Sequence, residues 1–180
     1  MRLLLLLVAW LIAVPAFARQ DDPRLTDLFD NLLKVEDPRG VKLLEGAIWA
    51  LWMQSGSDTV DLLLQRGTHA MGEGDYAVAM QLFTSITELD PKLAEGWNKR
   101  ATLFFLMGSF DRSAADVDKV LALEPRHFGA LSGLGMIELE RGHEREALNA
   151  FEKALAVNQH MASVKGEVAR LKKKLEGSKI

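Results

Sequence analysis

The sequence contains no cysteine, which removes several kinds of site at once. Without thiols the chain forms no disulfide, has no thiol nucleophile or zinc-thiolate centre, and carries no lipid on a cysteine behind a signal. A surplus of positive charge is also missing, because 22 Lys and Arg stand against 25 Asp and Glu, giving a net charge of -3. A nucleic-acid surface needs basic residues gathered on one face, so we expect no nucleic-acid partner. The 48% hydrophobic and 26% charged residues are typical of a globular domain.

Residues 1–18 have the features of a secretory signal peptide. Arg2 precedes an apolar run, and the stretch ending at Ala18 has the small-x-small pattern that signal peptidase accepts, which predicts cleavage after Ala18. The uncharged span is about 16 residues long, whereas a membrane helix needs roughly 20, so a retained anchor is the less favoured alternative. We expect a periplasmic or secreted protein with a polar segment at 19–24 and no membrane contact after cleavage.

A repeat of 34 residues follows, and it is the most informative feature of the sequence. Three segments align without insertion, at 60–93, 94–127 and 128–161. Each segment has an apolar stripe of helical period, a glycine turn, and a second stripe; Pro91 and Pro125 close the first two. The repeat therefore predicts three helical hairpins.

Equivalent positions in the three segments share residue size, which predicts how the hairpins pack. Small residues are expected to face one another across each hairpin so that its two helices approach closely, and large residues to bury against the next hairpin. The turn glycines are Gly74, Gly108 and Gly142; the small residues are 67, 101 and 135 facing 79, 113 and 147; the large ones are Leu63, Trp97, Leu131, Phe83, Val117 and Phe151.

These residues resemble the tetratricopeptide repeat (TPR) family over residues 60–161, and in particular the small exported TPR proteins of Gram-negative bacteria. The resemblance implies an all-α fold, a right-handed α-α superhelix or solenoid of helical hairpins, and a periplasmic location. Two departures stand in the third segment, where Gln159 replaces the closing proline and Glu144 replaces an aromatic residue. We expect the ends of that segment to be less tightly fixed.

The flanking segments are predicted to cap the array. Moving the frame back by one repeat places Gly40 at the turn, so 25–59 is expected to be a degenerate hairpin stacked before the first repeat. Trp49 and Trp52 then become packing residues, and a Trp/Met ligand box is the alternative. Residues 162–176 are expected to form a terminal capping helix with a solvated basic face. Its apolar stripe is Val164, Val168, Leu171 and Leu175.

The sequence offers no constellation for catalysis, a cofactor or a metal. The four histidines, at 69, 127, 143 and 160, are spread over the three repeats and form no i,i+4 pair. The glycines at 133 and 135 lack the strand and the Lys-Ser/Thr of a phosphate loop. Arg126 and His127 are interpreted as a solvated or capping pair, with a partner contact as the alternative. We predict a protein that is not an enzyme and that binds no cofactor or metal.

The resemblance implies that the first helix of each repeat lines a concave groove. Exposed methionine and aromatic side chains there suit adaptable recognition, and the Asn98 amide is expected to hold a partner's backbone. Cover by the N-terminal hairpin or the terminal helix is the alternative. The predicted groove residues are Leu64, Thr68, Met71, Asn98, Thr102, Phe105, Ser132, Met136 and Leu139.

Family members that clamp the C-terminal carboxylate of chaperones use Lys, Asn and Arg on these helices. Neither register of this sequence supplies the clamp: the matching residues are Leu64, Thr68, Lys99, Gly129 and Gly133, or Asp30, Lys34, Gln65, Glu95 and Lys99. The leading hypothesis is a non-catalytic, exported scaffold that binds a peptide or protein partner, with cell-envelope assembly as one setting. A self-associating structural oligomer is the alternative, and an enzyme is less favoured.

Overall fold

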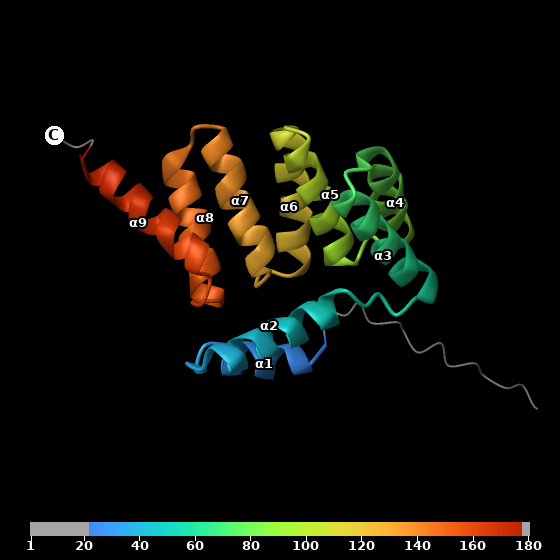
Figure 1. Ribbon diagram of the computed structural model, residues 1–180, viewed down its shortest axis with the longest axis horizontal. Coiled ribbons are helices and arrows are strands. Elements are labelled where there is room, and N and C mark those ends of the chain that lie inside the picture. Colours follow the sequence, from blue (N-terminus) through green and yellow to red (C-terminus); the bar gives the residue numbers. More distant parts are fainter. Residues whose placement is uncertain (1–21, 178–180) are drawn as a thin grey trace, which may run out of the picture.

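The computed structural model describes residues 22–177, and the predicted signal peptide with its cleavage site lies outside this range. The described part of the chain is all-helical, with nine helices and no strand (Figure 1). None of these helices is long and apolar enough to cross a bilayer. The helices are α1 (Arg24–Leu32), α2 (Pro38–Trp52), α3 (Asp58–Gly72), α4 (Tyr76–Leu89), α5 (Ala94–Leu106), α6 (Phe110–Leu123), α7 (Phe128–Glu140), α8 (Glu144–Val157) and α9 (Ala162–Gly177).

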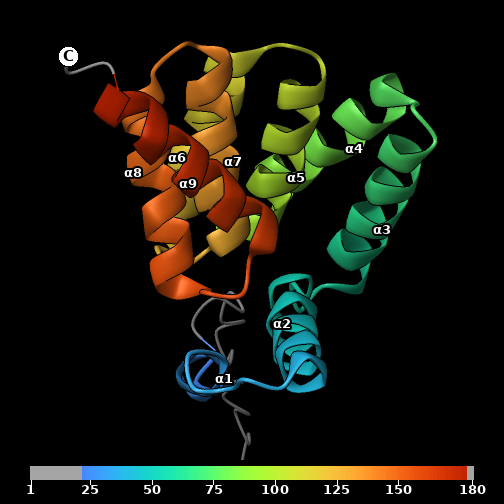
Figure 2. The same cartoon turned by 60° about the vertical axis from the view of Figure 1, so that its left-hand side comes forward.

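Helices α3 to α8 form three hairpins that stack side by side into a solenoid, and α9 lies against α8 (Figures 1 and 2). The turn within each hairpin falls on a predicted glycine. Gly74, Gly108 and Gly142 have φ angles of 79°, 70° and 78°, in the left-handed region that costs a glycine least. The second helix of the first hairpin starts beside its turn, where the Asp75 carboxylate accepts a hydrogen bond from Val78 N.

Small residues let the helices of each hairpin approach closely. The hydroxyl of Ser113 donates to the carbonyl of Ala101 over 2.7 Å, so this predicted pair meets across its hairpin. Gly135 lies beneath the ring of Phe151, and a Cβ atom built on it would stand 2.4 Å from the ring atom Cε1. Any side chain at position 135 would therefore displace a fully buried ring.

The C-terminal end of the solenoid is covered by α9. Its stripe of Val164, Val168 and Leu171 is buried in one cluster with Phe151 of α8. Lysines on the opposite face are exposed, and Lys172 pairs with Glu152 at 2.7 Å. The helix thus closes the last hairpin with an apolar side and presents a charged side to water.

The N-terminal hairpin does not stack before α3, and the prediction that it caps that edge is wrong. Figures 1 and 2 show α1 and α2 lying beneath the solenoid, along its lower side and beneath the loops that precede α7 and α9. The reason lies in the outer face of α3, where His69 is exposed. Its counterparts in the next repeats, Leu103 and Ile137, are buried against the preceding hairpin. With histidine at this position, α3 lacks the apolar contact that Leu103 and Ile137 make with the preceding hairpin.

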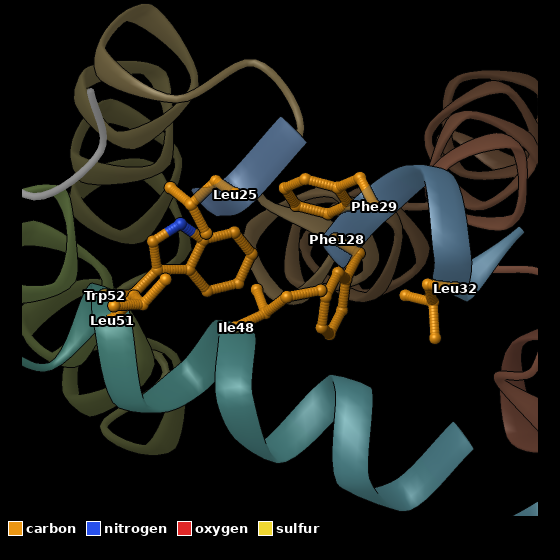
Figure 3. Close-up of a cluster of buried hydrophobic side chains, with 7 residues drawn as sticks. All are labelled: Leu25, Phe29, Leu32, Ile48, Leu51, Trp52 and Phe128. Atoms are coloured by element: carbon orange, nitrogen blue, oxygen red, sulfur yellow. The ribbon is translucent and has the colours of Figure 1, made fainter. Parts of the chain in front are cut away.

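The N-terminal hairpin instead shares a core with the third repeat. Figure 3 shows the ring of Phe128, from α7, enclosed by side chains of α1 and α2. Trp52 is 1% exposed and belongs to this core, and Trp49 packs against it, so their interpretation as packing residues is confirmed. The core consists of Leu25, Phe29, Leu32, Ile48, Leu51, Trp52 and Phe128.

The predicted turn at Gly40 is also wrong, because Gly40 lies in the first turn of α2. The Asp37 side chain accepts a hydrogen bond from Gly40 N over 3.1 Å, and Pro38 occupies the first helical position. Asp before Pro is a favourable start for a helix. It fixes the beginning of α2 earlier than the repeat frame allows.

Candidate functional site

A depression lies between α5 and α7, the first helices of the second and third hairpins. Its cavity volume is about 170 Å³, smaller than the roughly 300–1,000 Å³ of pockets that enclose a whole small-molecule ligand. Buried residues of α6 and the backbone of α7 form its floor. The residues that line it are Asn98, Ala101, Thr102, Phe105, Ser113, Val117, Gly129, Ala130, Gly133, Met136 and Ile137.

Four of the nine predicted groove residues come together in this depression. Asn98, Thr102 and Phe105 contribute from α5 and Met136 from α7. Thr102 is exposed and Met136 is 48% exposed, an unusual degree for a methionine in a helix that packs on both sides. These two side chains are accessible to a partner.

The other five predicted residues lie outside the depression. Thr68, Met71, Ser132 and Leu139 are partly exposed on α3 and α7. Leu64 is fully buried with Val60 and Phe83, and Met53, from the segment after α2, packs on that cluster. The prediction that Leu64 lines the groove is therefore wrong: its side chain belongs to the core.

The hydroxyl groups of three predicted groove residues donate their hydrogen bonds to backbone carbonyls of their own helices. Thr102 donates to Asn98 O over 2.9 Å, and Ser132 donates to Gly129 O over 2.9 Å. Thr68 on α3 donates to Leu64 O in the same manner. Each oxygen keeps its lone pairs as acceptors. The surface therefore presents methyl groups and acceptors rather than hydroxyl donors.

A buried polar cluster sits beside the depression and was not predicted. The Glu95 carboxylate, fully buried at the start of α5, accepts from Asn98 Nδ2 over 3.0 Å and lies 3.1 Å from His127 Nε2. Lys99 Nζ is 3.2 Å from its other oxygen. Burial acts to raise the pKa of Glu95, but the hydrogen bond with His127 and the nearby charge of Lys99 outweigh it, and the pKa is lowered.

His127 joins this cluster to the N-terminal hairpin. Its Nδ1 accepts a hydrogen bond from Ala130 N over 3.0 Å, which caps α7 and leaves Nε2 to donate to Glu95. The ring of Trp52 stacks on it with centroids 4.1 Å apart and an angle of 10° between the planes. The capping interpretation of His127 is confirmed. Both ring nitrogens are engaged and the side chain is inaccessible, so it cannot exchange protons with a substrate in this arrangement.

Arg126 does not join His127 in a pocket. Its guanidinium group bonds to Glu124 at 3.0 Å and lies over the ring of Phe29, 4.6 Å from the ring centroid. It therefore contacts the N-terminal hairpin of its own chain. Residues 22–177 contain no group of three or more His, Asp or Glu side chains placed to hold a metal ion.

The departure from proline at Gln159 has a structural role. Gln159 Nε2 donates to Leu33 O over 2.8 Å, and His160 Nε2 lies 3.0 Å from Leu32 O. Asn158 Nδ2 donates to Glu45 over 2.6 Å. The loop before α9 therefore binds the end of α1 and the face of α2. A proline at position 159 would have no side-chain donor for this contact.

The N-terminal hairpin also covers the end of the depression nearest to it. A Cβ atom built on Gly129 would stand 2.8 Å from Cη2 of Trp49. Gly129 is one of the positions where the chaperone-binding relatives of this pattern are expected to carry a clamp side chain. In this chain the indole of Trp49 fills the space that such a side chain would need.

Comparison with known proteins agrees with this architecture. A family model described as tetratricopeptide repeat matches residues 98–159. A TPR repeat-containing protein of Rhizobium etli is 36% identical over 156 residues, covering 87% of this chain and 76% of that protein. The small glutamine-rich tetratricopeptide repeat-containing protein 2 of Saccharomyces cerevisiae is 29% identical over 120 residues, which span 66% of this chain but only 34% of the yeast protein.

Solved structures show the same fold at lower identity. The first TPR of Spaghetti (RPAP3), bound to the HSP90 peptide SRMEEVD, superposes with a TM-score of 0.62 at 20% identity, covering 65% of this chain and 93% of that one. The type III secretion translocator chaperone SycD of Yersinia enterocolitica gives 0.63 at 17% identity, covering 67% and 96%. With the repeat register, the stacked hairpins and the Rhizobium relative, these likenesses identify the chain as a member of the tetratricopeptide repeat family.

Proposed function

We propose that this protein is a non-catalytic, exported interaction module that holds a peptide or protein partner on the concave face of its repeats. The observation that carries the proposal is the depression between α5 and α7, where Thr102 and Met136 are exposed over a floor of buried residues. Support for the kind of partner comes from the Spaghetti domain, whose structure holds a peptide, and from SycD, a translocator chaperone. Stacked helical repeats form an extended concave surface, which suits the binding of a partner.

The setting that we propose is the periplasm, where the module acts as a scaffold in assembly of the cell envelope. The support is the apolar N-terminal run ending at Ala18. Expression of the full chain in a Gram-negative host, followed by fractionation and N-terminal sequencing, tests this step. We expect a periplasmic protein that begins at Arg19. A chain that keeps Met1 and stays with the cytoplasm or the membrane would refute export.

Site-specific photo-crosslinking tests the groove. A photoreactive amino acid replaces Thr102 in one variant and Ala115, exposed on α6, in a control variant, in cells that naturally carry the protein. We expect an adduct with a defined partner from position 102 and not from 115. Equal adducts from both positions, or none from 102, would contradict the groove.

The Thr102→Glu variant adds a second readout. Because position 102 now carries Glu, the photoreactive residue is placed at Met136 instead. The added charge on the exposed rim is expected to lower the yield of the partner adduct, while helix content is unchanged. A second copy of this chain as the partner would instead support the self-associating oligomer. Mass measurement at several protein concentrations distinguishes that case, because only self-association depends on the concentration of the pure chain.

A further inference from the structure

The depression between α5 and α7 has an apolar and uncharged lining. Phe105 and Met136 are among its apolar lining residues, and within the described part of the chain the residues that line it carry no charge. Ser113 is the buried hydroxyl of the floor, and it donates to Ala101 O over 2.7 Å. The Asn98 amide donates to Glu95. The polar groups of the lining are thus held by their own chain, and a charged group entering the depression would lose water without a matching partner.

The lysine next to Asn98 in the sequence, Lys99, is already engaged. Lys99 Nζ lies 3.2 Å from the carboxylate of Glu95, and its side chain is only 19% exposed. Towards the N-terminal hairpin, Trp49 occupies the space above Gly129. An acidic side chain or a terminal carboxylate therefore finds neither a free cation nor an open end at this part of the groove.

What remains available suits an uncharged segment in an extended or helical form. The oxygen of Thr102 keeps acceptor lone pairs, so it can accept a hydrogen bond from an N–H group of a partner's backbone. The flexible thioether of Met136 adapts to side chains of different shape. Apolar contact then supplies the affinity, and the backbone contacts fix the orientation.

Resting on the proposed function, we propose that this depression is a subsite for one apolar, uncharged side chain of the partner, and that it rejects acidic side chains. The occupant to which the geometry points is an aromatic or aliphatic residue within a neutral stretch of a protein chain. Contact with the side chains of Phe105 and Met136 favours such a residue over a charged one.

Methyl NMR spectroscopy on the full mature chain tests the subsite directly. Methionine is labelled with ¹³C at the methyl group, and the probes are the amides of N-acetylphenylalanine, N-acetylleucine and N-acetylaspartate. The methyl group of Met136 reports the depression, and that of Met107, 51% exposed just after α5 but outside the lining, is the control. We expect the two apolar probes to shift Met136 saturably and to bind about tenfold or more tightly than the aspartate probe, a ratio within the range of hydrophobic pockets.

A variant that fills the depression completes the experiment. A Cβ atom at Gly133 meets nothing within 4 Å, so Gly133→Leu leaves the packing of α7 intact while its side chain enters the space. It is expected to abolish the shift of Met136. Gly46→Leu on α2, where a Cβ atom also meets nothing within 4 Å, is the matched control and is expected to bind as the parent does.

Three outcomes would overturn the subsite: equal binding of the aspartate probe, no saturable shift with either apolar probe, or an undiminished shift in Gly133→Leu. Any of them leaves the proposed function standing if the photoreactive residue at Thr102 still captures a partner. Conversely, saturable binding at Met136 without any captured partner supports the subsite and counts against the proposed function.

Discussion

Two glycines on the same helix allow a sharp test of how the hairpins pack. Gly133 and Gly135 both lie inside α7, so changing either to alanine improves helix propensity by about 1 kcal/mol. This gain cancels when the two variants are compared. The two variants differ in the room available for the added methyl group. A Cβ atom on Gly133 has no neighbour within 4 Å, whereas one on Gly135 stands 2.4, 2.5 and 2.7 Å from three ring atoms of Phe151.

The magnitude follows from the rigidity of that ring. Phe151 is 1% exposed and packs against Leu131, Ala147 and Val168, so it cannot rotate away freely. Overpacking a well-packed core costs about 1–3 kcal/mol. We expect Gly133→Ala to raise the free energy of unfolding by up to about 1 kcal/mol. Gly135→Ala should be about 1–3 kcal/mol less stable than Gly133→Ala.

Urea denaturation followed by far-UV circular dichroism measures this difference. The slopes of the transitions need to agree between the variants, because a repeat protein can lose cooperativity and a midpoint alone would then mislead. Equal stability of the two alanine variants would refute the close approach of Gly135 to Phe151. It would also remove the physical reason for small residues at this position of the repeat.

The remaining predictions concern the cluster and loops at the base of the solenoid and the absent clamp. The pKa of Glu95 is lower in the folded chain than its usual value of 4.5, so its contribution is present above that pH and is lost as the pH falls through the folded pKa. The advantage of the parent over Glu95→Gln, about 1–3 kcal/mol at neutral pH, should shrink in urea titrations below pH 4.5, and an advantage that grew there would contradict the pairing. Gln159→Ala should lower the free energy of unfolding by about 0.5–1.5 kcal/mol through loss of the bond to Leu33 O, while Gln81→Ala, exposed on α4, should change it by less than about 0.5 kcal/mol. The peptide SRMEEVD should show no saturable heat in calorimetry with this chain, and a saturable isotherm would show that the clamp residues are dispensable.

The repeat register made most of the solenoid predictable. The 34-residue spacing placed the turn glycines, the small positions and the large positions, and each hairpin from α3 to α8 follows that frame. Such prediction works because a hairpin cannot bury its apolar side alone, so every repeat carries the same packing constraints in its sequence. The exposed Met136 and Thr102 were found by the same route.

The place of the N-terminal hairpin could not be read from the repeat frame, although local signals bore on it. Asp37-Pro38 is a strong helix start and contradicts a turn at Gly40. His69, where the other repeats carry Leu103 and Ile137, marks an edge of the stack that takes no further hairpin. Gln159 in place of proline was the visible sign of the docking loop.

The polar cluster around Glu95 and the burial of Leu64 could not be predicted from the sequence, because both depend on tertiary contacts. Glu95 and His127 are separated by 32 residues and meet only when the second and third repeats stack. Leu64 is buried in one cluster with Val60 and Phe83, and Met53, from the segment after α2, packs on that cluster. Neither contact follows from helical periodicity, since periodicity defines faces and not what covers them.

The most direct test of the account concerns the docking of the N-terminal hairpin, which closes one end of the groove and leaves the α5–α7 depression open. The chain has no cysteine, so Leu33→Cys with Gln159→Cys gives a clean pair for a short bismaleimide crosslinker. Both positions are exposed, and in the folded chain Gln159 Nε2 lies 2.8 Å from Leu33 O. We expect efficient crosslinking within the monomer. Failure of this pair, together with crosslinking of Leu33→Cys to Leu62→Cys on the outer face of α3, would show that the hairpin stacks before the first repeat and would contradict the account.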